Sequence, residues 1–192
     1  CEDSFTGSIE VYDSPTAWFS ASTECEGLAT TFTNLSTGDG TLSYSWDFGD
    51  SNTSTDENPT HTYAAAGDYT AVLTVTNDNS CVSTHTVVVT VNALPTVDFT
   101  FNDVCEGTPT DFVNASDAGT YAWDFGDSNS STLEDVSHTF AVFGTYDVTL
   151  TVTDVNFCIN SATQQVEVFD LPDFTLTPSE VLCYGEATGS IV

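Results

Sequence analysis

Alternating apolar and polar residues dominate the chain and predict β-strands. Every second residue of the segment 145–153 is polar, mainly Thr, and the residues between them are Tyr, Val or Leu. This period of two is typical of a strand with one buried and one solvent-facing side. Segment 69–76 shows the same alternation, and the β-branched run 86–91 predicts a closing strand. We find no helical periodicity, so the sequence predicts an all-β fold.

The strand pattern occurs twice along the chain. Residues 44–52 (Tyr-Ser-Trp-Asp-Phe-Gly-Asp-Ser-Asn) return almost unchanged as residues 121–129, 77 residues later. Segment 67–76 returns as 144–153 at the same offset. Long, ordered self-similarity of this kind is the signature of repeated structural units. The sequence therefore predicts two tandem domains.

Cysteine and proline spacing predicts where the domains begin and end. A Cys precedes a Pro by 14 residues three times, at Cys1/Pro15, Cys81/Pro95 and Cys158/Pro172. We therefore expect complete domains at 15–94 and 95–171. Residues 1–14 are interpreted as the last strand of a preceding unit, and residues 172–192 as the start of a following one. On this interpretation the chain is a fragment of a longer tandem array.

Each repeat has the dimensions of an immunoglobulin-like sandwich. About seven short strands in about 80 residues, separated by turn clusters, favour a Greek-key β-sandwich. Aromatic residues fall on the apolar faces of the predicted strands, and a buried Trp is typical of such sandwiches. An exposed sugar-binding platform is the alternative role for the Trp residues. We assign to the core Trp46, Phe48, Tyr69, Trp123, Phe125 and Tyr146.

Charge excludes several functions. The 192 residues include 29 Asp and Glu but no Lys or Arg, for a formal net charge of −29. The chain therefore has no basic surface for nucleic acid and no polybasic membrane patch. It also has no Walker lysine and no arginine finger. No run of about 18 apolar residues predicts a membrane span. The 6 Cys show no metal-site spacing, which favours disulfides and an oxidising compartment.

The repeated motifs resemble those of PKD (polycystic kidney disease) domains. The motifs are Trp-Asp-Phe-Gly-Asp, then His-Thr-Tyr/Phe, then Gly-x-Tyr-x-Val-x-Leu-x-Val-Thr, which residues 67–76 match with Ala for the first Val. The flanking cysteines are similar to those of PKD modules in large Bacteroidetes surface proteins. Residues 182–192 resemble the opening of the repeat in SprB-type gliding adhesins. The resemblance implies tandem immunoglobulin-like sandwiches in an extended array.

The cysteines occupy matching places in the two repeats. Cys25 and Cys81 of the first repeat correspond to Cys105 and Cys158 of the second. We therefore predict one disulfide in each domain, Cys25–Cys81 and Cys105–Cys158. The rival pairings cross between the domains, and the repeat symmetry argues against them. Cys1 and Cys183 are expected to find partners outside this fragment.

Four repeated aspartates are candidates for a calcium site. They flank a glycine where a strand meets a turn, namely Asp47, Asp50, Asp124 and Asp127. Turn aspartates usually accept hydrogen bonds from backbone amides, and that is the simpler interpretation. Ca²⁺ is the alternative, because it prefers carboxylate oxygens and would relieve the unopposed charge. Some PKD domains are reported to bind calcium. His61 and His138 are interpreted as structural, since a zinc site would need further His or Cys nearby.

No catalytic arrangement of residues emerges, so we expect a non-enzymatic protein. By resemblance, the segment is a stalk or adhesive repeat of a bacterial cell-surface protein in gliding motility or adhesion, exported by the type IX secretion system. Its expected partners are neighbouring modules of the same chain, the secretion and motility machinery, and surface polysaccharide or another adhesion target. One alternative is a filament subunit completed by strand donation between the partial ends. The other is a set of spacer modules in a secreted hydrolase.

Overall fold

The fold consists of two successive β-sandwich repeats. The computed structural model describes residues 11–172, and within this range the regular structure is entirely β-strand. The prediction of an all-β fold made of tandem immunoglobulin-like sandwiches is confirmed. Cys1, Cys183 and most of the predicted partial units 1–14 and 172–192 lie outside the described residues, as do most of the segments invoked for strand donation.

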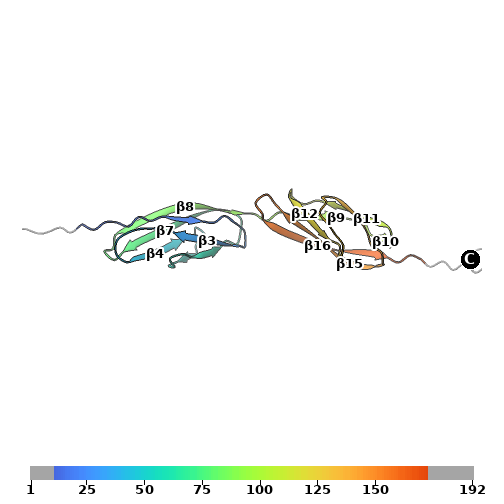
Figure 1. Ribbon diagram of the computed structural model, residues 1–192, viewed down its shortest axis with the longest axis horizontal. Coiled ribbons are helices and arrows are strands. Elements are labelled where there is room, and N and C mark those ends of the chain that lie inside the picture. Colours follow the sequence, from blue (N-terminus) through green and yellow to red (C-terminus); the bar gives the residue numbers. More distant parts are fainter. Residues whose placement is uncertain (1–10, 173–192) are drawn as a thin grey trace, which may run out of the picture. The chain divides into compact units, whose positions relative to one another are not determined.

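The first repeat contains two sheets, of three and five strands (Figure 1). Its strands are β1 (Phe19–Ala21), β2 (Glu24–Cys25), β3 (Ala29–Asn34), β4 (Leu42–Asp47), β5 (Thr53–Ser54), β6 (Thr60–Thr62), β7 (Gly67–Asn77) and β8 (Val82–Asn92). The smaller sheet has the order β1-β3-β6, and the larger has the order β2-β8-β7-β4-β5. All pairs are antiparallel except β2 with β8, which is parallel.

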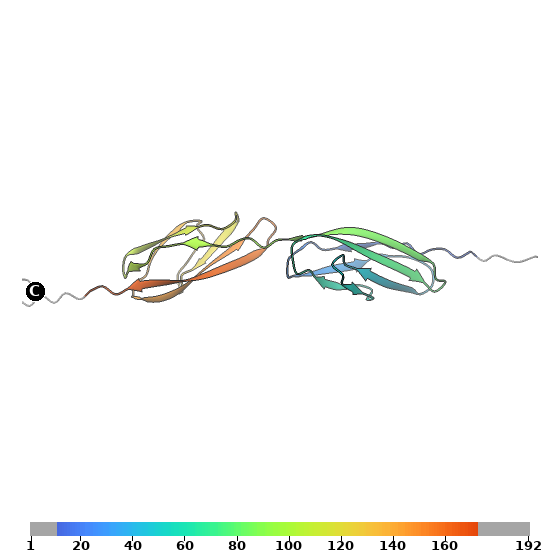
Figure 2. The same ribbon diagram turned by 180° about the vertical axis from the view of Figure 1, so that it is seen from behind.

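The long β7–β8 hairpin sets the register of the larger sheet. Tyr69 pairs with Val89 and Ala71 with Val87, so these apolar residues of both strands face the same side. The hairpin, drawn in green, is seen from the opposite side in Figure 2. At its far end, the short β2 strand pairs with the last residues of β8, with Cys25 opposite Asn92.

The second repeat has the same strand orders. Its strands are β9 (Phe99–Thr100), β10 (Val104–Cys105), β11 (Pro109–Asn114), β12 (Thr120–Asp124), β13 (Ser130–Ser131), β14 (Val136–Thr139), β15 (Gly144–Thr153) and β16 (Ile159–Phe169). The sheets are β14-β11-β9 and β10-β16-β15-β12-β13, and again the short β10 runs parallel to the last strand.

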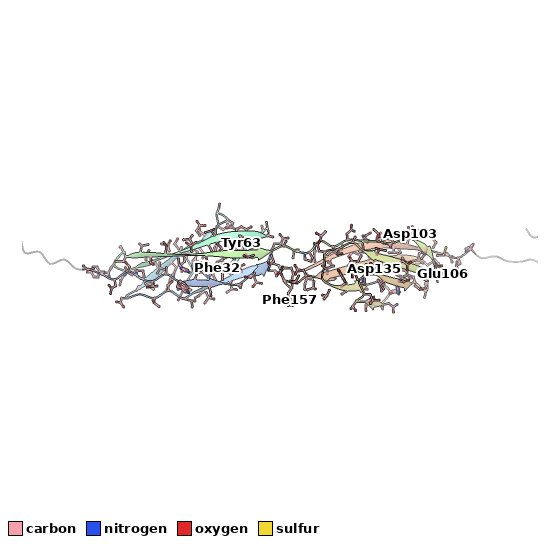
Figure 3. The ribbon with its side chains drawn as sticks, turned by 90° about the horizontal axis from the view of Figure 1, so that it is seen from above. Phe32, Tyr63, Asp103, Glu106, Asp135 and Phe157 are labelled. Atoms are coloured by element: carbon pink, nitrogen blue, oxygen red, sulfur yellow. A yellow bond between two sulfur atoms is a disulfide. The ribbon has the colours of Figure 1, made fainter. Side chains whose placement is uncertain are left out.

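Each repeat has an aromatic core centred on one Trp. Trp46 is 0% exposed and Trp123 is 1% exposed, and Phe48 and Phe125 are also buried. Phe19 packs edge-on against Trp46, with ring centroids 5.0 Å apart. Phe32 and Tyr63, labelled in Figure 3, complete the largest buried side chains of the first repeat. Aromatic pairs of this geometry stabilise a core beyond the area that they bury.

Tyr69 and Tyr146 lie at the rim of these cores rather than in their centres. Both are half-buried. The Tyr69 ring stacks on Tyr63 at a centroid distance of 4.1 Å, and its hydroxyl donates to the carbonyl of Ala65. Tyr146 makes the matching hydroxyl bond to Val142. Each ring therefore packs against the core while its hydroxyl reaches a backbone carbonyl at the exposed rim.

The cysteines are not paired as predicted. The structure bonds Cys25 to Cys158 and leaves Cys81 and Cys105 as free thiols, which corrects both Cys25–Cys81 and Cys105–Cys158. Strand β8 gives the physical reason. Cys25 lies opposite the last residue of β8, whereas Cys81 directly precedes its first residue. Strand rise over that length separates the two by roughly 35 Å, far beyond the reach of a disulfide.

The Cys25–Cys158 bond lies within one compact unit of the chain. The chain divides into two such units, and the first includes, besides the residues up to Val97, the short segments Ser116–Thr120 and Thr151–Ser161. Cys158 belongs to the last of these segments. In the sequence, however, Cys25 belongs to the first repeat and Cys158 to the second. The pairing between repeats, which the repeat symmetry argued against, is thus the one in the structure.

Candidate functional site

The repeated Trp-Asp-Phe-Gly-Asp motif forms the turn that follows β4. The Asp47 Oδ1 atom accepts a hydrogen bond from the Gly49 amide at 2.9 Å, and Asp50 Oδ1 accepts one from the Asn52 amide at 3.0 Å. Asp50 Oδ2 lies 3.0 Å from Asn52 Nδ2 and 2.7 Å from His61 Nε2. Both aspartates therefore hold the turn, as short polar side chains commonly do, and Asp50 also positions the histidine.

His61 is enclosed by aromatic rings. It stacks face to face on Phe48, with centroids 4.4 Å apart and an interplanar angle of 3°. Tyr63 meets it edge-on at 4.6 Å and donates its hydroxyl to the Phe48 carbonyl at 2.9 Å. Asp50 thus contacts an imidazole whose orientation is fixed from two sides. The histidine is structural in this arrangement.

The second repeat reproduces the turn. Asp124 accepts from the Gly126 amide at 3.0 Å, and Asp127 accepts from the Asn129 amide at 3.0 Å. His138 Nε2 lies 2.7 Å from Asp127 Oδ2, and its ring stacks on Phe125 at 4.1 Å. Phe140 takes the place of Tyr63, so the hydroxyl bond to the turn carbonyl is present only in the first repeat.

A glycine lets each turn approach the neighbouring strand. Gly49 has φ +83°, and a Cβ there would come within 2.6 Å of the Thr70 carbonyl oxygen. Gly126 has φ +75°, and its Cβ would lie 2.8 Å from the Asp147 carbonyl oxygen. The left-handed conformation and the close approach together explain why glycine occupies this position in both repeats.

The aspartate–histidine pairs shift the acidity of the carboxyl groups. Partial burial disfavours the charged form, but the hydrogen bonds from His61 and Asn52 outweigh it and hold the pKa of Asp50 below its usual value. The same balance lowers the pKa of Asp127. Burial, together with the nearby charge of Asp50, raises the pKa of Tyr63 to about 12.

Within each turn the two aspartates accept hydrogen bonds from different amides. Asp47 faces its own turn amide, whereas Asp50 faces Asn52 and His61. Across the described residues, no group of three or more His, Cys, Asp or Glu side chains has metal-binding geometry. Calcium binding through Asp47, Asp50, Asp124 and Asp127 therefore stays a prediction. Residues 11–172, which the structure describes, contain no helix long and apolar enough to cross a membrane.

The sequence analysis assigned no role to Glu26 or Glu106, the glutamates that directly follow Cys25 and Cys105. Glu26 Oε2 accepts from the Ala66 amide at 2.9 Å, which holds the loop before β7 against β2. Glu106 accepts from the Phe143 amide at 3.0 Å in the same way. The repeated Cys-Glu-Gly tripeptide was the available signal, because it preserves this carboxylate in both repeats.

A protein-family model matches both repeats. The model describes the PKD domain, and it matches residues 12–91 and 92–169. The chain belongs to the PKD domain family. PKD domains are non-catalytic modules, which agrees with turns whose carboxylates and histidines all hold structure.

Two groups of relatives illustrate the family. The chain is similar to the pre-pro-metalloprotease PrtV of Vibrio cholerae, 45% identical over 75 residues that make up 36% of this chain and 8% of the relative. It is also 43% identical to a microbial collagenase of Vibrio alginolyticus over 53 residues, 28% of this chain and 6% of that protein. The chain therefore spans less than a tenth of the length of these relatives.

Solved PKD structures are similar to a single repeat. The PKD1 domain of Vibrio anguillarum Epp is 38% identical, with a TM-score of 0.40, over 43% of this chain and 99% of that domain. The PKD1 domain of Vibrio cholerae PrtV is 40% identical, with a TM-score of 0.39, over 42% of this chain and 99% of that domain.

Proposed function

We propose that the two PKD domains are a non-enzymatic stalk or adhesive segment of a bacterial cell-surface protein, in adhesion or gliding motility. The observation that carries the proposal is the use of the repeated polar residues. Asp50, His61 and their counterparts Asp127 and His138 are engaged in holding turns. They are therefore occupied by structure rather than available for a reaction. Neighbouring modules, surface polysaccharide, and secretion and motility machinery would be the partners.

Charge and cysteine chemistry support a place outside the cell. A disulfide is stable in oxidising environments such as the cell surface. The 29 carboxylates without any Lys or Arg make neighbouring chains repel each other. Such a surface favours solubility and separation between molecules, which suits a segment exposed at the cell boundary.

Deletion of residues 12–169 from the full-length protein in its source cell tests the proposal. Surface exposure of the shortened protein is followed with an antibody to a retained part, and cell attachment is measured alongside. We expect export to continue while attachment or gliding falls. Unchanged attachment and gliding with normal export would contradict an adhesive or stalk role.

The relatives favour a second candidate function, that of spacer modules in a secreted hydrolase. Similar domains occur in a protein named as a metalloprotease and in one named as a collagenase. On this alternative the same deletion leaves attachment intact and lowers the cleavage of a large, surface-bound substrate, with little effect on a small soluble one. The two readouts therefore separate the candidates.

A further inference from the structure

Two cysteines in each repeat lie at opposite ends of its last strand. We call Cys25 and Cys105 the opening cysteines and Cys81 and Cys158 the hairpin cysteines. Cys25 pairs with Asn92 at the end of β8, and Cys105 pairs with Phe169 at the end of β16. Each hairpin cysteine directly precedes the first residue of the same strand. Neither repeat can therefore bond its own two cysteines.

The hairpin cysteines have the same local structure. The Cys81 amide donates to Asn77 Oδ1 at 2.9 Å, and its carbonyl accepts from the Asn77 amide. Cys158 makes the same two contacts with Asp154, at 2.8 Å for the side-chain bond. The preceding residue has a left-handed φ in both turns, 64° at Ser80 and 62° at Phe157. Cys81 is thus presented by the same turn as the bonded Cys158.

The observed bond follows a simple rule. It joins the opening cysteine of one repeat, Cys25, to the hairpin cysteine of the repeat that follows, Cys158. Both bonded residues are buried, whereas Cys81 and Cys105 are partly exposed. Repeating the rule assigns a partner to each remaining thiol. Cys81 requires the opening cysteine of a repeat before it, and Cys105 requires the hairpin cysteine of a repeat after it.

We propose that Cys81 and Cys105 are the two open ends of a disulfide ladder, and that each bonds a cysteine of a neighbouring PKD repeat. The neighbour is either on the same polypeptide or on a second copy of it. In each bond two thiols form one S–S link and release two protons and two electrons. A small-molecule or protein disulfide accepts both and becomes two thiols. The inference rests on the proposed extracellular role, since cytosolic thiols stay reduced.

Disulfide mapping of the protein isolated from its source without reduction tests the ladder. Free thiols are alkylated first, and the chain is cut with an Asp/Glu-specific protease because it has no Lys or Arg. We expect Cys25 linked to Cys158, Cys81 linked to an opening cysteine and Cys105 linked to a hairpin cysteine. Comparison of the chain mass before and after reduction shows whether the partner is on the same polypeptide.

Several results would overturn the ladder. Alkylated Cys81 or Cys105 in the surface-exposed protein would mean that the thiols stay free. A Cys81–Cys105 bond within one polypeptide would break the opening-to-hairpin rule. So would a bond between two cysteines of the same type, such as Cys81 to Cys1, which has the hairpin spacing to the next Pro, or Cys105 to Cys183, which follows a Pro as the opening cysteines do. Because mapping is independent of attachment, the ladder can fail while the adhesive role stands, and the reverse also holds.

Matched variants give a second measurement. In Cys105→Ser we expect the link to the following repeat to disappear while Cys25–Cys158 persists. In Cys81→Ser the link to the preceding repeat disappears instead. Cys25→Ser is the control, because it should free Cys158 and leave the bonds of Cys81 and Cys105 in place. A Cys105–Cys158 bond in the unsubstituted protein would contradict the rule.

Discussion

At the scale of single residues, each repeat depends on a few polar side chains placed beside aromatic rings. Asp50 and Asp127 are the clearest case, since each joins a turn to a stacked histidine. The aspartate must be ionised to accept these hydrogen bonds fully. The stability of each repeat should therefore respond to acid through this carboxyl group.

Both carboxyl groups have a pKa below the usual value, so they stabilise the fold above the unfolded-state pKa of about 3.9. This stabilisation is lost as the pH falls through the lower, folded-state pKa. We expect urea unfolding midpoints to fall between about pH 5 and about pH 2. Asp50→Asn and Asp127→Asn should each flatten that fall. An unchanged slope in both variants would show that other carboxyl groups control acid unfolding.

Thr30 and Thr110 offer a stabilising substitution. Both are 0% exposed, and within the described residues neither Oγ1 atom has a hydrogen-bond partner. An unsatisfied buried hydroxyl destabilises a fold by about 1–3 kcal/mol. We expect Thr30→Val and Thr110→Val each to raise the free energy of unfolding by about 1 kcal/mol. Denaturant melts measure this, and destabilisation by both would mean that the hydroxyls are satisfied in solution.

At the scale of elements, the turn after β4 depends on its glycine. We expect Gly49→Ala to destabilise the first repeat by roughly 3 kcal/mol, because the left-handed φ and the close Thr70 carbonyl both oppose a side chain. Gly27→Ala is the matched control. Gly27 has a similar φ of +80°, but a Cβ at this position would meet no atom within 4 Å, so its cost should be only about 1 kcal/mol. Equal losses in thermal melts would contradict the close-approach argument.

Much of this element-scale structure could be predicted from the sequence. Alternation in segments 69–76 and 145–153 locates strands because side chains on a strand face opposite sides in turn. The repeated Trp could be assigned to the core because the residues two positions away, on the same face of the strand, are also aromatic. The cysteine pairing could not be predicted, since it depends on which end of β8 each residue occupies. The short parallel β2 strand decides that, and two residues carry no periodicity.

At the scale of the whole molecule, unopposed negative charge is the dominant property. Like charges raise the energy of a compact state, and salt screens them within about 10 Å at 0.1 M. We expect the melting temperature to rise with monovalent salt.

The prediction of calcium sites adds a sharper test. A rise that saturates with a few Ca²⁺ per chain and is not matched by Mg²⁺ supports specific sites, whereas equal responses to both ions indicate screening alone.

The Cys25–Cys158 bond also determines how far the chain can be stretched. It spans a sequence separation of 133 residues, which contains strands from both repeats. When the chain is pulled from residues outside this loop, the tension bypasses everything inside it. Reduction should therefore release additional contour length of roughly 450 Å. Single-molecule pulling with and without reductant measures this increment, and an increment near 200 Å would instead indicate loops of the Cys25–Cys81 size.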